Sequence, residues 1–334
     1  MVKRISPYLA RVLLWCAMAA LLIWSAENVS ALRQYSAVSL RYHEPFCGQT
    51  AYQLRKSAIE RETENAFWPT FWHETRARVE VEFRTVEAPC ILYSGDASLV
   101  WPAKYLSGAA PGVTDGTGCA ISSALSQELW GGIDVVGKTI KVDGAERVVR
   151  GVFEGDQPLA LLSFRDENTG QSFTAIELSG GPSSPNRIDA ELFVMSAGLG
   201  RPDSILIGTP VIIASAMSAL PLLILFVYLL ARLLLRLRER PVVIYVVMFS
   251  LFFGIALFLP GILDALPSWV IPSRLSDFSF WGAMAQQIGD DLHEYLSLAP
   301  QMRDVIYTIQ FYKQIGATFL SVICALSLCF QNTL

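Results

Sequence analysis

Four long apolar stretches constrain the fold of this chain more than any other feature. Each is close to the roughly 20 residues that an α-helix needs to cross a lipid bilayer. With 52% hydrophobic and only 17% charged residues, the chain is also too apolar for an ordinary soluble domain. We therefore expect a membrane protein with four transmembrane α-helices, over residues 7–26, 209–232, 241–260 and 314–330, the last being the shortest.

The first apolar stretch, residues 7–26, allows two interpretations. It follows Lys3 and Arg4, as the apolar region of a signal peptide also follows basic residues. A signal peptide, however, has a shorter apolar region and ends in a small-residue cleavage site. The segment Trp24-Ser25-Ala26-Glu27 is a poor site of that kind, so the sequence favours a retained N-terminal anchor.

Basic residues orient the four helices, because Lys and Arg accumulate in short cytoplasmic loops. They gather near the N-terminus, as Lys3, Arg4 and Arg11, and in the turn 232–241, as Arg232, Arg236, Arg238 and Arg240, against Glu239 alone. We expect a multi-pass protein of the cell (inner) membrane, with both chain termini and this turn in the cytoplasm and residues 27–208 and 261–313 outside. No basic patch stands in an aqueous region, which argues against nucleic-acid binding.

The external region 27–208 is long enough for one domain with its own core, and its patterns mix α and β. Ala77–Val86 alternates apolar and charged residues, which predicts one half-exposed strand. The aromatic residues between Phe67 and Trp72 are spaced as in a helix interrupted at Pro69. We expect their rings to pack in the core; the alternative is a platform on which a ligand stacks.

One external segment, Gly132–Thr139, matches the nucleotide-binding pattern G-x-x-x-x-G-K-[ST] letter for letter. A phosphate-binding loop needs a strand before it and a helix after it, because the helix N-terminus supplies the N–H groups. Here Ile121–Trp130 has helical spacing, and Ile140–Val142 alternates toward a hairpin turn at Asp143-Gly144. We therefore interpret the match as accidental.

The surrounding run, Tyr93–Glu154, carries a family resemblance. It contains, in order, "YSGD", "SGAAPG", "CAIS", "LWGG", "DVVGKTIKVDG" and "RVVRGVFE". This order resembles the extracytoplasmic core domain of MacB-like (FtsX-superfamily) ABC transporter permeases. The resemblance implies a permease-type subunit of an ABC transporter complex that transmits motion from a separate cytoplasmic ATPase to the external domain. It also implies a homodimer, or a heterodimer with a second permease subunit.

Two groups of residues matter under this resemblance. Turn chemistry at Gly95, Asp96, Gly108, Pro111, Gly118, Gly137 and Gly144 is expected to shape the external fold. The candidate ATPase-coupling surface is formed by Arg236, Arg238, Glu239 and Arg240. The coupling element is short, because Pro241 follows at once and the next span begins. A rival interpretation is therefore a membrane-anchored interaction or sensing protein that has lost ATPase coupling.

The second external segment, residues 261–313, is longer than the usual connection in that family. Asp277 can cap a helix whose apolar stripe contains Phe278, Trp281, Met284, Ile288, Leu292 and Tyr295. The opposite side carries Asp290, Asp291 and Glu294. This amphipathic helix is expected either to lie on the membrane or to cover the external domain, and periodicity does not separate these two options.

The sequence predicts no catalytic, metal or cofactor site. The histidines His43, His73 and His293 are scattered without ligand spacing, and no G-x-S-x-G elbow surrounds a serine. We therefore do not expect an enzyme.

Six cysteines divide by location. Cys47, Cys90 and Cys119 lie in the external region, where oxidation to a disulfide is chemically allowed. Three thiols form at most one internal bridge. Our guess for the pair is Cys90 with Cys119, although the sequence does not determine connectivity.

Overall fold

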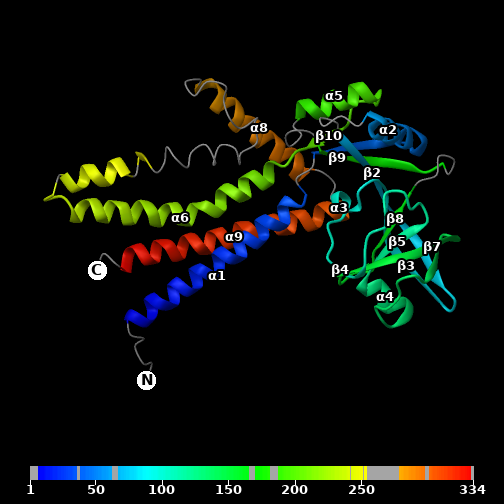
Figure 1. Ribbon diagram of the computed structural model, residues 1–334, viewed down its shortest axis with the longest axis horizontal. Helices are drawn as coiled ribbons and strands as arrows, with labels where there is room; N and C mark the ends of the chain where they lie inside the picture. Colours follow the sequence, from blue (N-terminus) through cyan, green and yellow to red (C-terminus); the bar gives the residue numbers. More distant parts are fainter. Residues whose placement is uncertain are drawn as a thin grey trace. The chain divides into compact units, whose positions relative to one another are not determined.

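The computed structural model describes residues 7–35, 38–61, 67–164, 170–180, 187–240, 242–250, 252–253, 278–297 and 301–331 (Figure 1). Its contacts divide the chain into two units. The helical unit comprises Met1–Arg33, Thr209–Leu292 and Ile306–Leu334. The sheet unit comprises Gln34–Gly208 and His293–Val305.

Three helices in the described part of the chain are long and apolar enough to cross a membrane. They are α1 (Pro7–Arg33), α6 (Thr209–Arg236) and α9 (Met302–Gln331). A small core within the helical unit joins them through Met18, Leu225, Ala325 and Leu328. The structure thus contains an apolar helix at three of the four predicted stretches. The fourth prediction, 241–260, is helical at 242–250 and 252–253, and its remainder lies outside the described residues.

A buried polar side chain connects these three helices. Gln314 of α9 is fully buried, and its Nε2 donates to Ser25 Oγ of α1 at 2.8 Å. The same amide is 3.3 Å from the carbonyl oxygen of Ala214 in α6 and 3.3 Å from Thr318 Oγ1. Hydrogen bonds between apolar helices hold them in one relative register, because an unpaired amide in lipid is costly.

Helix α9 begins at Met302, earlier than the apolar stretch predicted from Gln314. The charged residues Arg303, Asp304 and Lys313 end the apolar run in the sequence. The backbone nevertheless continues as helix through them, and Arg303 and Asp304 are buried within the sheet unit. The helix therefore begins before the apolar stretch predicted at 314–330.

Helix α8 (Phe278–Ser297) confirms the amphipathic helix, although the proposed cap at Asp277 lies outside the described residues. Its acidic side is only partly exposed to solvent: Asp290 is exposed, whereas Asp291 and Glu294 have partners. In the helical unit, Asp291 is buried and accepts from Thr209 Oγ1 at 3.1 Å. In the sheet unit, Glu294 forms an ion pair with Arg187 at 3.0 Å. Periodicity identifies residues that share a face, but the partners decide which face is covered.

The sheet unit is built on one ten-stranded mixed sheet in the order β10-β1-β9-β2-β3-β8-β5-β7-β4, with β6 pairing both β2 and β7. The strands are β1 (Val38–Cys47), β2 (Phe67–Val81), β3 (Arg84–Ser94), β4 (Tyr105–Gly108), β5 (Gly118–Ser122), β6 (Thr139–Val142), β7 (Ala145–Phe153), β8 (Ala160–Ser163), β9 (Ser172–Gly180) and β10 (Ser204–Leu206). The pairs β3·β8 and β5·β7 are parallel, and the other pairs are antiparallel.

These pairings close part of the sheet into a ring. The chain of neighbours β2-β3-β8-β5-β7 returns to β2 through β6. The long strand β2 belongs to both parts, since its first half pairs with β9 and its last residues pair with β6. Each of the six strands in the closed ring has a neighbour on both sides. None of them therefore presents a row of unpaired backbone groups with which another chain could pair.

Helices cover both faces of the sheet. On one face, α2 (Gly48–Arg61), α4 (Ser123–Trp130) and α5 (Arg187–Ala197) pack against the larger core. On the other face, the short helix α3 (Ala97–Val100) contributes Ala97 and Val100 to a second core around Trp72 and Tyr93. The unit therefore has two hydrophobic layers separated by the sheet.

The segment from Phe67 to Val86 corrects two predictions. The aromatic residues from Phe67 to Trp72 form the start of β2 and not a helix, because alternation places Phe71 in one core and Trp72 in the other. The predicted single strand Ala77–Val86 is a hairpin, in which Val81 pairs with Arg84. Neither turn residue has a positive φ or is glycine, so no turn signal interrupts the alternation in the sequence.

The Gly132–Thr139 segment has the flanks that the sequence predicts. Helix α4 precedes it and ends at Trp130 with Gly131 as its C-cap, and strand β6 follows it. The β6–β7 hairpin turns at Asp143 and Gly144, whose φ values are 47° and 82°, as a type I′ turn requires. A strand therefore leaves the loop where a phosphate-binding loop has a helix.

The guessed disulfide is not formed in this fold. Cys90 and Cys119 are both buried free thiols. Cys90 pairs with Ala160 and Cys119 with Leu162, so strand β8 lies between the two cysteine-bearing strands. Because neighbouring strands lie about 4.7–4.9 Å apart, two strands with a third between them, such as β3 and β5, are about 9–10 Å apart. A disulfide needs Cα atoms within about 7 Å, so the intervening strand excludes the bridge.

Candidate functional site

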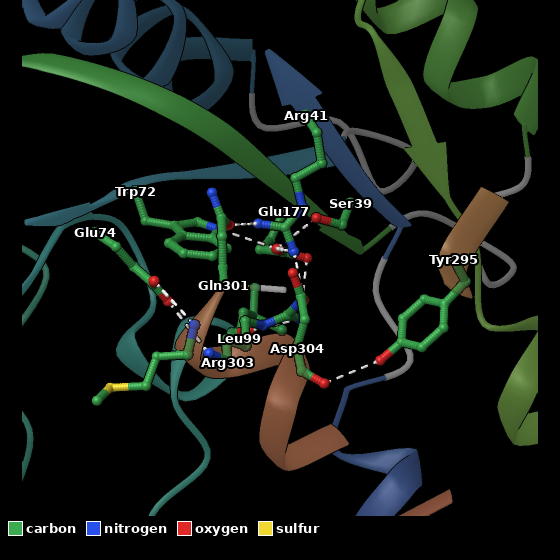
Figure 2. A network of polar contacts seen from close by, with 11 residues as sticks. Ser39, Arg41, Trp72, Glu74, Leu99, Glu177, Tyr295, Gln301, Arg303 and Asp304 are labelled. Atoms are coloured by element: carbon green, nitrogen blue, oxygen red, sulfur yellow. Dashed lines mark hydrogen bonds and ion pairs between the residues drawn. The ribbon is translucent and has the colours of Figure 1, made fainter. Parts of the chain in front are cut away.

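A network of buried charges lies on the α3 face of the sheet unit (Figure 2). Its centre is Glu177 of β9, whose side chain is fully buried. Sheet register brings partners to it, because Ser39 of β1 and Thr70 of β2 lie directly opposite Glu177. Arg41 and Trp72, two residues further along the same strands, therefore point to the same face.

Four groups surround the Glu177 carboxylate. Ser39 Oγ and Trp72 Nε1 donate to Oε1 at 2.7 and 2.9 Å. Arg303 donates to Oε2 at 3.1 Å, and a guanidinium nitrogen of Arg41 lies 3.9 Å from Oε1. Buried charges are stable only when paired and hydrogen-bonded, and this carboxylate meets both conditions.

The two arginines share a second carboxylate. Arg41 donates to Asp304 Oδ1 at 2.8 Å and also to the Gln301 amide oxygen. Arg303 lies 3.8 Å from Asp304 and donates to the Leu99 carbonyl oxygen at 3.1 Å. The Nε atoms of Arg41 and Arg303 have no hydrogen-bond partner among the described residues.

Aromatic rings enclose the arginines. The guanidinium carbon of Arg41 lies 4.5 Å from the centre of the Trp72 ring. That of Arg303 lies 5.9 Å from Trp72 and 5.3 Å from Tyr35. Such cation–π contacts stabilise desolvated cations. Burial raises the pKa of Tyr35 to about 12, although the Arg303 charge opposes this rise, so its ring stays neutral at physiological pH.

Glu74 of β2 caps the first turn of α9. Its two carboxylate oxygens accept from the backbone N–H groups of Met302 and Arg303 at 2.9 and 3.2 Å. The first N–H groups of a helix lack partners within the helix, and a carboxylate there also interacts favourably with the helix dipole. Burial raises the pKa of Glu74, and these two N–H groups oppose the rise.

The network fixes one segment of the chain onto a distant part of it. Residues 301–304 are bound by side chains of β1, β2 and β9, including Arg41, Glu74 and Glu177. The donors and acceptors are used by the protein itself, and no group of three or more potential metal ligands occurs within the described ranges. The arrangement therefore holds residues 301–304 against the sheet.

The residues predicted from the sequence lie elsewhere. Gly95 and Asp96 form the turn before α3, where Asp96 caps the helix through Ser98 N at 2.9 Å. Gly108 has a φ of +66°, and a Cβ there would lie 2.1 Å from the Arg150 carbonyl oxygen. These positions are distributed over separate turns and do not form a single site; the others are Pro111, Gly118, Gly137 and Gly144.

The predicted coupling residues belong to the helical unit. Helix α6 ends at Arg236, and residues 237–239 form a turn. Arg236, Arg238, Glu239 and Arg240 are all exposed.

Sequence reasoning missed the charge network. Its one local signal is Glu177, an acidic residue inside the apolar strand Phe173–Leu178. That pattern indicates a buried charge but does not identify its partner. Arg303 is 126 residues away along the chain, and only the fold brings the two together.

Comparisons with known proteins give likenesses of fold only. No protein-family model matches the chain, and no curated protein matches it. One similar solved structure is the extracellular domain of the noncanonic ABC-type transporter YknZ from Gram-positive bacteria, with 11% identity, a TM-score of 0.37, and coverage of 50% of this chain and 96% of that one.

Two further structures are similar. The periplasmic region of MacB from Actinobacillus actinomycetemcomitans has 13% identity and a TM-score of 0.42, covering 55% of this chain and 94% of that one. A domain of a proposed permease protein from Porphyromonas gingivalis has 17% identity and a TM-score of 0.32, covering 50% and 86%.

Proposed function

We propose that this chain is a permease-type subunit of an ABC transporter complex. The observation that carries the proposal is the order of elements. An apolar helix, α1, leads into the sheet unit, and the sheet unit leads into a second apolar helix, α6. Within that unit, the run Tyr93–Glu154 forms the α4–β6–β7 arrangement that its resemblance to MacB-like external domains implies. In this role the chain itself needs no catalytic group.

The proposed topology places the sheet unit outside the cell membrane and both termini in the cytoplasm, as the positions of the basic residues favour. Cys47 of the sheet unit is an exposed thiol, so it provides a native test. It should react with a membrane-impermeant maleimide in intact cells, and Cys47→Ser should remove this labelling. In the Cys47→Ser chain, Leu237→Cys should react only after permeabilisation. Labelling of Leu237→Cys in intact cells would reverse the topology.

The proposed ATPase-docking surface is the turn after α6. Its backbone is fixed by hydrogen bonds from Leu237 N to Leu233 O at 3.0 Å and from Arg240 N to Leu237 O at 2.7 Å. A fixed turn presents its arginines to a partner with little loss of backbone freedom. Planar guanidinium groups pair with carboxylates in a bidentate manner, so acidic residues of a separate ATPase subunit are the expected partners.

The experiment compares the native chain with the triple variant Arg236→Lys, Arg238→Lys and Arg240→Lys. Lysine preserves the charge that orients the helices but removes bidentate pairing. The variant should insert into the membrane at the native level yet lose the copurifying ATPase subunit and the ATPase activity of the complex. Retention of both at native levels would exclude arginine-mediated docking at this turn.

One observation favours a second candidate, an interaction or sensing protein without ATPase coupling. Only a short turn separates the end of α6 at Arg236 from the helical residues that begin at 242, so a docking helix between them has no room. The two functions predict different results for the unmodified protein. If no ATPase subunit copurifies with the native chain from its membrane, the second function replaces the first.

A further inference from the structure

Helix α5 of the sheet unit has two apolar faces. Ala190 and Val194 are buried and pack on the larger core. Ile188, Leu192 and Met195 follow one another at intervals of four and three residues, so they form a stripe along the other side of the helix. Their side chains are 67%, 57% and 77% exposed. The described part of the chain leaves this stripe uncovered.

The stripe borders a cleft. A cavity of about 560 Å³ lies between α5 and the segment that leads into β10, and Met195 lines it. Arg187 and Ile205 also line it, together with Glu294. The exposed apolar stripe of α5 therefore borders a concave surface whose lining includes charged residues as well as Met195 and Ile205.

The start of α5 is attached to the strand that leads into the membrane. Arg187 donates to the Ile205 carbonyl oxygen at 3.4 Å and to Glu294 at 3.0 Å, and Ile205 N donates to Glu294 at 3.0 Å. Thr209, the first residue of the apolar helix α6, is only four residues beyond Ile205. Four residues extend at most about 14 Å, whatever the arrangement of the two units. These hydrogen bonds and the short covalent link from Ile205 to Thr209 together keep the base of α5 close to the start of the apolar helix α6.

We propose that the stripe Ile188, Leu192 and Met195 inserts into the interfacial layer of the outer leaflet and binds phospholipid there. Fixed charge near the stripe is mainly acidic, with Asp189, Glu191, Asp203 and Glu294 against Arg187 and Arg201. Attraction to anionic lipid therefore does not drive the contact. Burial of apolar side chains drives it, so zwitterionic phospholipid is sufficient. This inference rests on membrane insertion and not on the proposed transport function.

The test places the photoreactive residue p-benzoylphenylalanine at Leu192 in the full chain, reconstituted in phosphatidylcholine vesicles. The control position is Phe83, which is 94% exposed at the β2–β3 turn. The part of β2 that pairs with β9 runs from Phe67 to Trp72, and the turn follows Val81. At about 3.3 Å per residue, the strand places the turn roughly 40 Å along its length from the middle of the part beside β9. After illumination, mass spectrometry should find phospholipid adducts at Leu192 and only background at Phe83.

A second variant tests the stripe as a unit. Ile188→Asn with Met195→Asn changes only exposed side chains of α5, so the fold should be retained, which limited proteolysis checks. With the probe at Leu192, its lipid adducts should fall to the level at Phe83. Added phosphatidylglycerol should leave the native adduct yield unchanged.

Three outcomes would overturn the proposal. One is a crosslink from Leu192 to a second copy of the chain or to another protein in place of lipid. The others are adducts at Leu192 no more frequent than at Phe83, and adducts that require anionic lipid.

Discussion

Replacing Glu177 by glutamine removes one buried charge while it nearly preserves the shape of the side chain. Ser39 and Trp72 keep an oxygen to which they can donate. Arg303 and Arg41 lose the carboxylate between them and retain only Asp304 as a buried counter-ion of the network. The substitution therefore isolates the electrostatic contribution of the network from its packing.

The magnitude follows from burial. The Glu177 side chain is 0% exposed and that of Arg303 is 6% exposed, so solvent does not compensate for the lost charge. Breaking a buried ion pair from one side destabilises a protein by about 3–5 kcal/mol. For a unit of this size, each kcal/mol shifts the unfolding midpoint by about 2–4 °C, so Glu177→Gln should lower it by about 6–20 °C.

The buried thiols Cys90 and Cys119 provide the assay. A thiol-reactive fluorophore reaches them only when the sheet unit unfolds, whereas the four other thiols, of which Cys16 and Cys47 are exposed, set the baseline. The full chain is heated in detergent with the dye, and the midpoint of the slow increase in fluorescence is recorded. Burial raises the pKa of the Cys90 thiol to about 12, which also suppresses its reaction in the folded state.

The matched control is Glu154→Gln in an exposed pair. Lys104 and Glu154 are 3.7 Å apart, with side chains 80% and 62% exposed. Exposed pairs contribute about 0–1 kcal/mol, so this midpoint should move by at most about 4 °C. Equal shifts for Glu177→Gln and Glu154→Gln would refute the argument that the network stabilises the unit through buried charge.

Three other predictions concern single positions. Gly108→Ala should destabilise the sheet unit by about 1–3 kcal/mol in the same thermal assay, because it combines strain at positive φ with a clash at Arg150 O. The control Gly112→Ala should have little effect, because nothing lies within 4 Å of a Cβ at that position. Equal effects of the two substitutions would contradict this reasoning. Lys138→Ala should leave ATP binding by the purified chain unchanged, and saturable binding lost in the variant would show that the loop is a nucleotide site. Burial raises the pKa of Glu74 above its ordinary 4.5, so the folded state holds this proton more tightly than the unfolded chain. Stability should therefore fall as the pH rises from the ordinary pKa of Glu74 to its raised pKa in the folded state. Glu74→Gln should flatten this dependence of the unfolding midpoint on pH.

Features encoded by neighbouring residues were predictable. The apolar helices α1 and α6 follow from long runs without charge. The Asp143-Gly144 turn follows from a dipeptide that adopts positive φ, and the structure confirms it. The hairpin at Glu82 and Phe83 has no such dipeptide. Alternation continued through it in the sequence, and only pairing of Val81 with Arg84 divided one predicted strand into two.

The candidate site could not be predicted in the same way. Glu177 was visible as a charge in an apolar strand, but the order β1-β9-β2 is what brings Arg41 and Trp72 beside it. The start of α9 was equally hidden, because Arg303 and Asp304 look like an end to an apolar span. Their burial depends on partners from strands far away in the chain.

The sequence by itself determined that the chain carries helices long and apolar enough to cross a membrane, that Asp143-Gly144 forms a turn, and that the Gly132–Thr139 segment lies between a helix and a strand. These properties depend on residues within a few positions of one another, because apolar length, φ preference and periodicity are local. The tertiary structure alone decided that Cys90 and Cys119 are separated by β8, and that Glu177 neutralises Arg303. Strand order decides the first, and the contact of residues 301–304 with the sheet decides the second. Both depend on which faces bury one another across the whole domain.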